Sequence, residues 1–279
     1  MNHKLKPVKI GSSVVGAGPF SVWAGPCSVE SLQQFLTVAG EVKRLGGAGL
    51  RGGLFKLRTD PSAFQGLGQE AYQIARTVKA QTGLPFVSEI TDPRQVEELH
   101  DVVDAFQVGS RNMHNYSLLK ELSRTRKPIL LKRGLSALFK EWMLAADYLV
   151  RGGNENIVLC ERGIRTFETA TRNTFDINAI ALAKVEAPFP VLADPSHGTG
   201  IAKLVPAIAL ASAAAGADGL LIEVHPDPAN AMSDGYQSLN LAEFENLMIK
   251  LPRLLQSLDR SLATLMPRTS PAQPAMAEL

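Results

Sequence analysis

The chain has 279 residues, of which 45% are hydrophobic and 20% are charged, an ordinary composition for a globular protein. Its 29 basic and 27 acidic residues leave a formal net charge of +2, which argues against a nucleic-acid or membrane-surface partner. No apolar run approaches the roughly 18 residues of a membrane-spanning helix, and no apolar stretch follows the basic start, so we expect neither a transmembrane helix nor a signal peptide. Only two cysteines are present, Cys27 and Cys160, so we expect free thiols in a cytoplasmic protein.

Short apolar segments rich in Val, Ile, Leu and Phe alternate along the chain with longer amphipathic ones, the pattern of buried parallel strands and covering helices. The predicted strands are residues 22–24, 48–54, 85–89, 105–108, 128–132, 157–160, 190–193 and 219–224. The predicted helices are residues 31–44, 68–80, 93–100, 116–125, 138–151, 178–184, 202–215 and 241–258, with a kink expected at Pro252. This alternation predicts an α/β fold, a (β/α)₈ TIM barrel, although the pattern alone also fits a doubly wound open sheet.

The chain is expected to form one domain with short extensions. Residues 1–20 are predicted to be an N-terminal extension in which residues 8–15 form a hairpin on the barrel floor, and residues 21–262 are predicted to be the catalytic barrel. Residues 263–279, with Pro267, Pro271 and Pro274 among small polar residues, are predicted to be a disordered tail.

Polar residues gather where the predicted strands end, which is where barrel enzymes place their active sites. The cations among them are Arg51, Lys56, Arg58, Arg111, Lys132 and Arg162. Any one of them is most simply a solvated surface charge. Cations that converge on one barrel mouth would repel one another, so the set predicts a substrate pair with several negative charges, such as two phosphates and a carboxylate. A rival reading makes Lys132 a Schiff-base lysine, with its pKa lowered by neighbours such as Arg133.

Four further residues at strand ends or in the following loops have side chains that bind metal ions: Cys27, His197, Glu223 and Asp234. Separately, each is more often structural than functional. Together they predict a divalent metal site, and the mixed S, N and O donors suit Mn²⁺, Fe²⁺, Co²⁺ or Zn²⁺ better than Mg²⁺ or Ca²⁺. His225 and Asp227 are rival ligands, ranked lower because the Pro-rich turn is expected to aim them elsewhere.

Several motifs carry a family resemblance that covers nearly the whole chain. Ala-Gly-Pro-Cys-Ser-Val-Glu-Ser (24–31), Arg-Gly-Gly-Leu-Phe-Lys-Leu-Arg-Thr (51–59), Asp-Pro-Ser-His-Gly-Thr-Gly (194–200) and Glu-Val-His-Pro-Asp-Pro (223–228) resemble those of 3-deoxy-7-phosphoheptulonate (DAHP) synthases, type I beta branch. The resemblance implies a transferase that condenses phosphoenolpyruvate with erythrose 4-phosphate, releasing phosphate, in the first step of the shikimate pathway of aromatic amino acid biosynthesis. It also implies a homo-oligomer, a dimer or tetramer, and suggests chorismate mutase as a partner.

The same resemblance assigns roles to individual residues. It implies that Cys27, His197, Glu223 and Asp234 hold the divalent metal, most simply Mn²⁺. The mechanism that the charges suggest makes Lys56 a catalytic proton donor, together with Cys27 and His197 as catalytic residues. The resemblance makes Arg51, Lys56, Arg111, Lys132 and Arg162 the phosphoenolpyruvate contacts, and Arg58 and Thr59 the aldose phosphate contacts.

This chain departs from the family at two points. Leu57 replaces the proline of the usual Lys-Pro-Arg-Thr segment, which frees the backbone beside Arg58 and puts the aldose affinity and identity in question. The barrel is also expected to begin near the start of the chain, as a bare catalytic core without a regulatory domain. Three alternatives stay open: 3-deoxy-octulosonate 8-phosphate synthesis from arabinose 5-phosphate, a Schiff-base aldolase, and a barrel that serves only to bind a partner enzyme.

Overall fold

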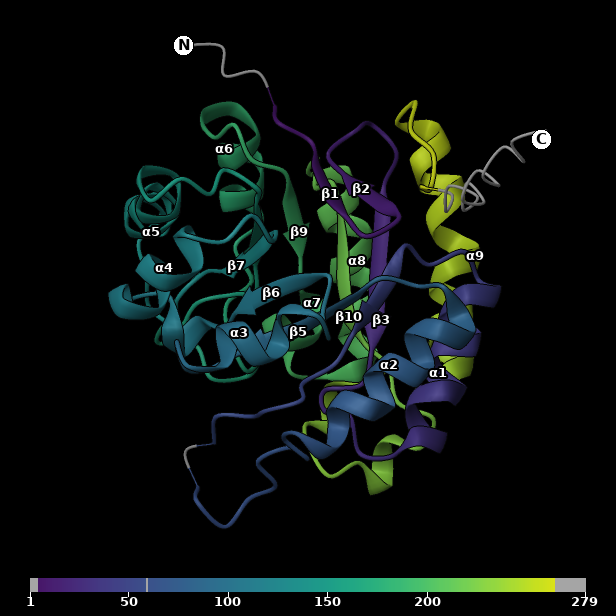
Figure 1. The fold of residues 1–279 in the computed structure, drawn as a ribbon. Coiled ribbons are helices and arrows are strands. Elements are labelled where there is room, and N and C mark those ends of the chain that lie inside the picture. Colours follow the sequence, from purple (N-terminus) through teal and green to yellow (C-terminus); the bar gives the residue numbers. More distant parts are fainter. Residues whose placement is uncertain (1–4, 59, 264–279) are drawn as a thin grey trace, which may run out of the picture.

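Eight parallel strands close into a barrel in the order β10-β3-β4-β5-β6-β7-β8-β9 (Figure 1). This computed structural model describes residues 5–58 and 60–263. The strands are β3 (Ser21–Gly25), β4 (Gly49–Arg51), β5 (Phe86–Ile90), β6 (Ala105–Val108), β7 (Ile129–Lys132), β8 (Ile157–Glu161), β9 (Val191–Ala193) and β10 (Gly219–Glu223). Strand β10 pairs with β3 along its whole length, from Gly219 opposite Ser21 to Glu223 opposite Gly25. The predicted barrel is therefore confirmed, and the open sheet is excluded.

Helices surround the barrel and cover its outer face (Figure 1). They are α1 (Leu32–Arg44), α2 (Glu70–Thr82), α3 (Gln95–His100), α4 (Tyr116–Ser123), α5 (Phe139–Arg151), α6 (Ile177–Glu186), α8 (Val205–Ala214) and α9 (Leu241–Ser257), whereas the short helix α7 (Pro195–Thr199) lies at the end of the barrel where the strands finish. Short 3₁₀ turns span Ser110–Asn112, Ala202–Leu204, Pro228–Asn230 and Gly235–Gln237. Helix α9 runs through Pro252 as one helix and buries an apolar stripe that includes Phe244 and Leu251. Within residues 5–58 and 60–263, no helix combines the length and apolarity needed to cross a membrane.

Helix α7 is the element that the sequence pattern missed. Its five residues are too few for an apolar period, and the segment contains Gly198. Local chemistry forms it instead, because the Asp194 side chain accepts a hydrogen bond from the His197 backbone N–H and Pro195 occupies the first turn.

The predicted strand over residues 48–54 is shorter in the structure, where β4 ends at Arg51. Beyond that point the Gly53 N–H donates to the Cys27 carbonyl, so the chain pairs with the loop after β3 and leaves the sheet. A Cβ on Gly25 would lie 1.9 Å from the Arg51 carbonyl oxygen, so the two segments meet at a distance that only glycine permits. These contacts bring the loops after β3 and β4 together above the barrel.

The N-terminal hairpin, β1 (Val8–Ile10) with β2 (Ser13–Val15), lies at the end of the barrel where the strands begin (Figure 1). Its side chains Val8, Ile10 and Val15 join the apolar cluster that fills the barrel interior and includes Trp23 and Leu130. The predicted hairpin and its place on the barrel floor are thus observed, and the opposite end is left for a site. The boundaries at residues 20 and 262 stay predictions, and residues 264–279 of the predicted tail lie outside the described part of the chain.

Candidate active site

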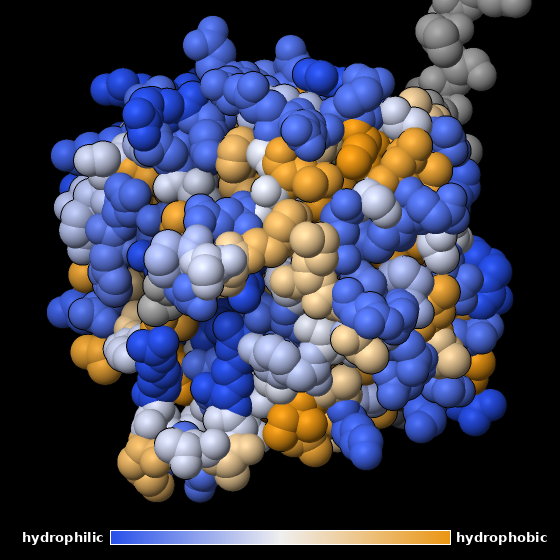
Figure 2. All heavy atoms as spheres, turned by 90° about the horizontal axis from the view of Figure 1, so that it is seen from below, coloured by the Kyte–Doolittle hydropathy of each residue, from blue (hydrophilic) through white to orange (hydrophobic). Residues whose placement is uncertain are grey.

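A cavity of about 420 Å³ lies at the end of the barrel where the strands finish. Figure 2 views this face, on which strongly hydrophilic side chains gather around a hollow. The structure brings every predicted cation to this cavity and adds two more, so the basic residues that line it are Arg51, Lys56, Arg58, Arg111, Lys132, Arg162, Arg165 and Arg172. The acidic residues in its lining are Asp60, Glu89 and Asp234. This excess of positive charge suits the binding of anions.

Arg51 and Arg162 are buried at the cavity, each with 3% of its surface exposed. The Arg51 Nη1 atom donates to the Pro26 carbonyl at 2.7 Å and to Glu223 Oε1 at 2.9 Å. The Nε–H group of each arginine, in contrast, finds no hydrogen-bond partner among the described residues. A buried donor without a partner is costly, and an anion in the cavity would satisfy it.

Lys132, at the end of β7, is paired with Asp194, which follows β9. The Lys132 ammonium lies 2.5 Å from Asp194 Oδ2, and the same carboxylate oxygen lies 2.8 Å from His197 Nδ1. Burial disfavours the charged form of Asp194, but His197 and Lys132 outweigh it and hold the pKa of Asp194 well below its ordinary value. Burial lowers the pKa of His197, although Asp194 opposes this effect. A carboxylate with these partners is charged.

The loop after β4 carries Lys56, Leu57 and Arg58 to the rim of the cavity. Burial acts against the Lys56 ammonium, but nearby acids, including Glu89 and Glu223, raise its pKa above the ordinary value. The Arg58 Nη1 atom lies 3.9 Å from Asp234 Oδ1. Arg111 reaches the cavity from the 3₁₀ turn after β6. Thr59, the second predicted aldose phosphate contact, lies outside the described residues.

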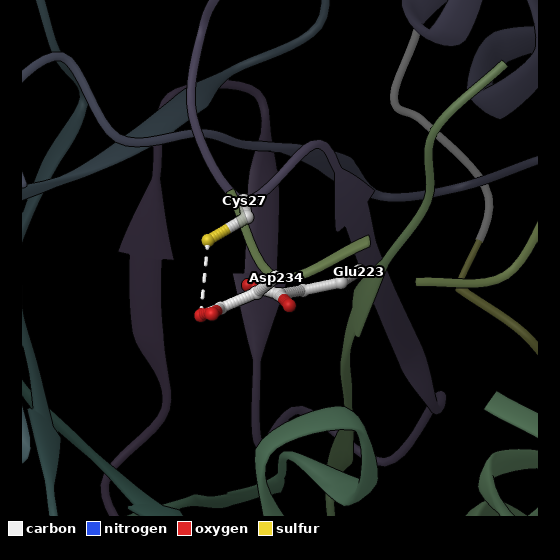
Figure 3. Close-up of side chains that lie close together, drawn as sticks. All are labelled: Cys27, Glu223 and Asp234. Carbon is white, nitrogen blue, oxygen red and sulfur yellow. Dashed lines mark hydrogen bonds between the residues drawn. The ribbon is translucent and has the colours of Figure 1, made fainter. Parts of the chain in front are cut away.

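Cys27, Glu223 and Asp234 form a compact group beside the cavity (Figure 3). Each contributes one potential ligand atom, and these atoms lie within 4.8 Å of one another. The Cys27 thiol donates to Asp234 Oδ2 at 3.4 Å. His197, the fourth predicted ligand, lies next to this group, with its Nε2 atom 3.6 Å from Glu223 Oε1. The four residues predicted as metal ligands are thus neighbours in the fold.

The chemistry of this donor set fits a borderline divalent cation. Sulfur and imidazole nitrogen suit Mn²⁺, Fe²⁺, Co²⁺ or Zn²⁺, whereas a site for Mg²⁺ or Ca²⁺ would use oxygen donors. Burial, with Glu223 nearby, raises the pKa of the Cys27 thiol to about 12, so the thiol is protonated in the absence of a cation. Burial opposes ionisation of Glu223, but His197 and Arg51 lower its pKa, so this carboxylate is already charged.

Two residues that the sequence analysis did not single out hold these carboxylates in place. Gln237 is fully buried, and its Nε2 atom donates to Glu223 Oε2 at 2.6 Å. Arg172 donates to Gln237 Oε1 at 2.6 Å and to Asp234 Oδ2 at 3.4 Å. Neither residue ends a predicted strand, so no local sequence signal separated them from ordinary loop residues.

The rival ligands His225 and Asp227 do not join the group. The His225 Nε2 atom lies 3.2 Å from Glu30 Oε2, and its Nδ1 atom accepts the Asp227 backbone N–H at 3.0 Å. Glu30 also accepts the Met232 backbone N–H at 2.9 Å. His225 and Glu30 thereby connect the loop after β3 to the loop that carries Asp234.

Comparison with known proteins agrees with this architecture over most of the chain. A phospho-2-dehydro-3-deoxyheptonate aldolase of Thermotoga maritima is 41% identical over 251 residues, which are 90% of this chain and 74% of that protein. A 2-dehydro-3-deoxyphosphooctonate aldolase of Thioalkalivibrio sulfidiphilus is 31% identical over 254 residues, 85% of this chain and 90% of that protein. The crystal structure of the Thermotoga maritima DAHP synthase superposes with a TM-score of 0.90 at 39% identity, covering 93% of this chain and 76% of that one. A truncated form of the Thermotoga maritima enzyme gives a TM-score of 0.87 at 37% identity and covers 93% of this chain and 95% of its own.

The family assignment follows from the extent of the match. Residues 6–258, from the N-terminal hairpin through the last barrel helix, match the model of the DAHP synthetase I family. The chain therefore belongs to the DAHP synthetase I family.

Proposed function

We propose that this protein condenses phosphoenolpyruvate with erythrose 4-phosphate to give DAHP and phosphate, as the first step of the shikimate pathway. The observation that carries the proposal is that one cavity lined by cations directly adjoins the Cys27–Glu223–Asp234 group. A site for two phosphorylated substrates needs many positive charges, and the activation of an aldehyde needs an electrophile beside them.

The cations divide between the two substrates. Arg51, Lys56 and Lys132 would anchor the carboxylate of phosphoenolpyruvate, and Arg111 and Arg162 would hold its phosphate. The buried Nε–H groups of Arg51 and Arg162, which have no hydrogen-bond partner within residues 5–58 and 60–263, support these two roles. Arg58 and Thr59 would bind the phosphate of the aldose, on the rim of the cavity. Fixing two anions at close range supplies much of the rate enhancement.

The reaction joins C3 of phosphoenolpyruvate to the aldehyde carbon of the second substrate. Water adds at C2, and the resulting tetrahedral carbon expels phosphate while the new keto group forms. Lys56, which lines the cavity, would donate a proton to the new hydroxyl group. Arg111 and Arg162 would stabilise the charge of the departing phosphate.

A divalent metal, held by Cys27, His197, Glu223 and Asp234, would supply Lewis-acid polarisation of the aldehyde. We propose Mn²⁺ as the metal, with Fe²⁺, Co²⁺ and Zn²⁺ as alternatives that the same donors accept. Cys27 would bind as a thiolate, so metal binding would displace its proton.

Arabinose 5-phosphate is the alternative second substrate. The relative from Thioalkalivibrio sulfidiphilus is named a 2-dehydro-3-deoxyphosphooctonate aldolase, and Leu57 departs from the family segment beside Arg58. The higher identity to the Thermotoga maritima protein favours erythrose 4-phosphate.

A phosphate-release assay with phosphoenolpyruvate and a panel of aldose phosphates, with and without added Mn²⁺, tests the proposal. We expect release with erythrose 4-phosphate, dependent on the metal, and little with arabinose 5-phosphate. Borohydride trapping provides the test of a Schiff-base route through Lys132, and we expect no trapped adduct. Full activity of protein stripped of metal would contradict the proposed chemistry.

We also propose that the protein works in the cytoplasm as a dimer or tetramer. The two buried, free thiols, Cys27 and Cys160, support a reducing compartment. Light scattering during gel filtration tests the oligomeric state, and adding a chorismate mutase to the same measurement tests whether that enzyme is a partner.

A further inference from the structure

Asp194 lies between the proposed anion site and the proposed metal site. It is 1% exposed, and both of its side-chain oxygens have partners. Oδ1 accepts the His197 backbone N–H at 3.0 Å, and Oδ2 lies 2.5 Å from Lys132 Nζ and 2.8 Å from His197 Nδ1. We propose that Asp194 is a positioning residue that couples phosphoenolpyruvate binding to metal binding, because Lys132 and His197 share its one carboxylate.

The contact with His197 decides how that ring can act. An ionised carboxylate only accepts hydrogen bonds, so the hydrogen of the imidazole lies on Nδ1. The lone pair of the ring is then on Nε2, the atom that lies 3.6 Å from Glu223 Oε1 in the metal group. A carboxylate placed behind a histidine in this way orients the ring and makes it a better ligand.

The contact with Lys132 makes this arrangement sensitive to an anion. In the free protein Asp194 is the counter-ion of the Lys132 ammonium. A substrate carboxylate bound to Lys132 would take over part of that role and leave more of the negative charge of Asp194 to His197. His197 would then hold a cation more tightly, and by linkage the cation would tighten substrate binding by the same factor. This inference rests on the proposed function, which makes Lys132 a phosphoenolpyruvate contact and His197 a ligand.

The protein contains a matched control for Asp194. Asp218 is also buried, lies 2.7 Å from Lys184 Nζ, and accepts the Val191 backbone N–H at 2.7 Å. It precedes β10, so it lies at the opposite end of the barrel from the cavity. Asp218→Asn therefore removes an equivalent ion pair without touching either proposed site.

The test measures Co²⁺ affinity through the absorption band of the Cys27 thiolate–cobalt pair, with and without saturating phosphoenolpyruvate. In the natural protein and in Asp218→Asn, we expect phosphoenolpyruvate to tighten Co²⁺ binding about fivefold or more. Asp194→Asn keeps a capping oxygen for α7 but not the charge. In this variant we expect weaker Co²⁺ binding, and the Co²⁺ affinities with and without phosphoenolpyruvate should be nearly equal. Two results would overturn the inference. One is that phosphoenolpyruvate tightens Co²⁺ binding by the same factor in folded Asp194→Asn as in the natural protein, and the other is that it does not tighten Co²⁺ binding in the natural protein.

A second variant, Lys132→Met, removes the other partner of the Asp194 carboxylate, and it tests the inference even if Asp194→Asn does not fold. Lys132→Met should tighten Co²⁺ binding without phosphoenolpyruvate, and by more than Arg111→Met, which removes a charge from the same cavity without contacting Asp194. Equal effects of the two substitutions would overturn the inference. Natural protein that binds neither Co²⁺ nor phosphoenolpyruvate would instead contradict the proposed function itself.

Discussion

Replacing Gln237 by methionine tests whether the buried network around Glu223 holds the metal group in place. The change keeps the approximate length of the side chain and removes both polar atoms. Glu223 Oε2 loses its 2.6 Å donor, and Arg172 loses its 2.6 Å acceptor. Glu223 is completely buried, so water cannot replace the lost donor, whereas Arg172 is partly exposed and can be solvated.

The size of the effect follows from these contacts. A hydrogen bond to a charged group contributes about 1.5–3 kcal/mol, so the loss of two, one of them partly replaced by water, should lower the free energy of unfolding by about 3–4 kcal/mol. A ligand whose supporting hydrogen bond is removed typically loses metal affinity by about 10–100-fold, and we expect a loss in that range for Gln237→Met. Urea denaturation and Co²⁺ titration measure the two quantities separately.

Asn154→Leu is the control for the loss of a buried amide. Asn154 is equally buried, and its Nδ2 atom donates to the Leu122 and Lys127 carbonyls at the end of the barrel remote from the cavity. This variant should be destabilised but should bind Co²⁺ as tightly as the natural protein. If Gln237→Met is folded and also binds Co²⁺ with natural affinity, the reasoning about Glu223 is refuted.

Three further predictions concern the metal, the aldose and the core. Cys27→Ala removes one of the four proposed ligands, so we expect severely weakened Mn²⁺ binding, measured by calorimetry, and activity abolished by a chelator in the natural protein. Leu57→Pro should restrict the backbone beside Arg58 before the substrate binds. If this lowers the entropic cost of binding by about 0.4–1 kcal/mol, KM for erythrose 4-phosphate should fall about two- to fivefold. An unchanged or raised KM would contradict this prediction. Trp142→Ala removes a fully buried side chain whose Nε1 donates to the Leu131 carbonyl, so urea denaturation should show a loss of about 3–5 kcal/mol, with Co²⁺ affinity unchanged.

The near-zero net charge illustrates how composition and placement differ. The total of +2 argues against a broadly basic protein, and it hides the eight cations that line one cavity. Glu223, Asp194 and Asp234 form ion pairs with Arg51, Lys132, Arg58 and Arg172 at the cavity, and acids elsewhere in the chain balance the other cations only in the total.

The sequence by itself determined the α/β class and the positions of most of the cations, whereas the closure of the barrel was seen only in the structure. Apolar runs such as Val191–Ala193 can be buried on both faces only in a sheet covered by helices, so their alternation with amphipathic segments indicated a parallel α/β sheet, and the count of eight favoured the barrel over an open sheet. Since parallel strands end on the same side, Lys132 and Arg162 could be placed at one mouth from their positions in the chain. The same rule placed Cys27 near Glu223, although 196 residues separate them, because their strands β3 and β10 are the pair that closes the barrel.

Only the tertiary structure decided how these side chains are connected. Gln237 and Arg172 lie in loops, where no period or strand end marks them, and they reach Glu223 and Asp234 only after the chain has folded. The sequence likewise contains Asp194 without indicating that its carboxylate serves both Lys132 and His197. Hydrogen bonds are sensitive to differences of a few tenths of an ångström in donor–acceptor distance and to direction, and in loops the backbone conformation sets both. Burial, in contrast, depends only on which face of an element is apolar. For that reason the pattern of residues was sufficient for the fold class, and the arrangement of charges within the site required the structure.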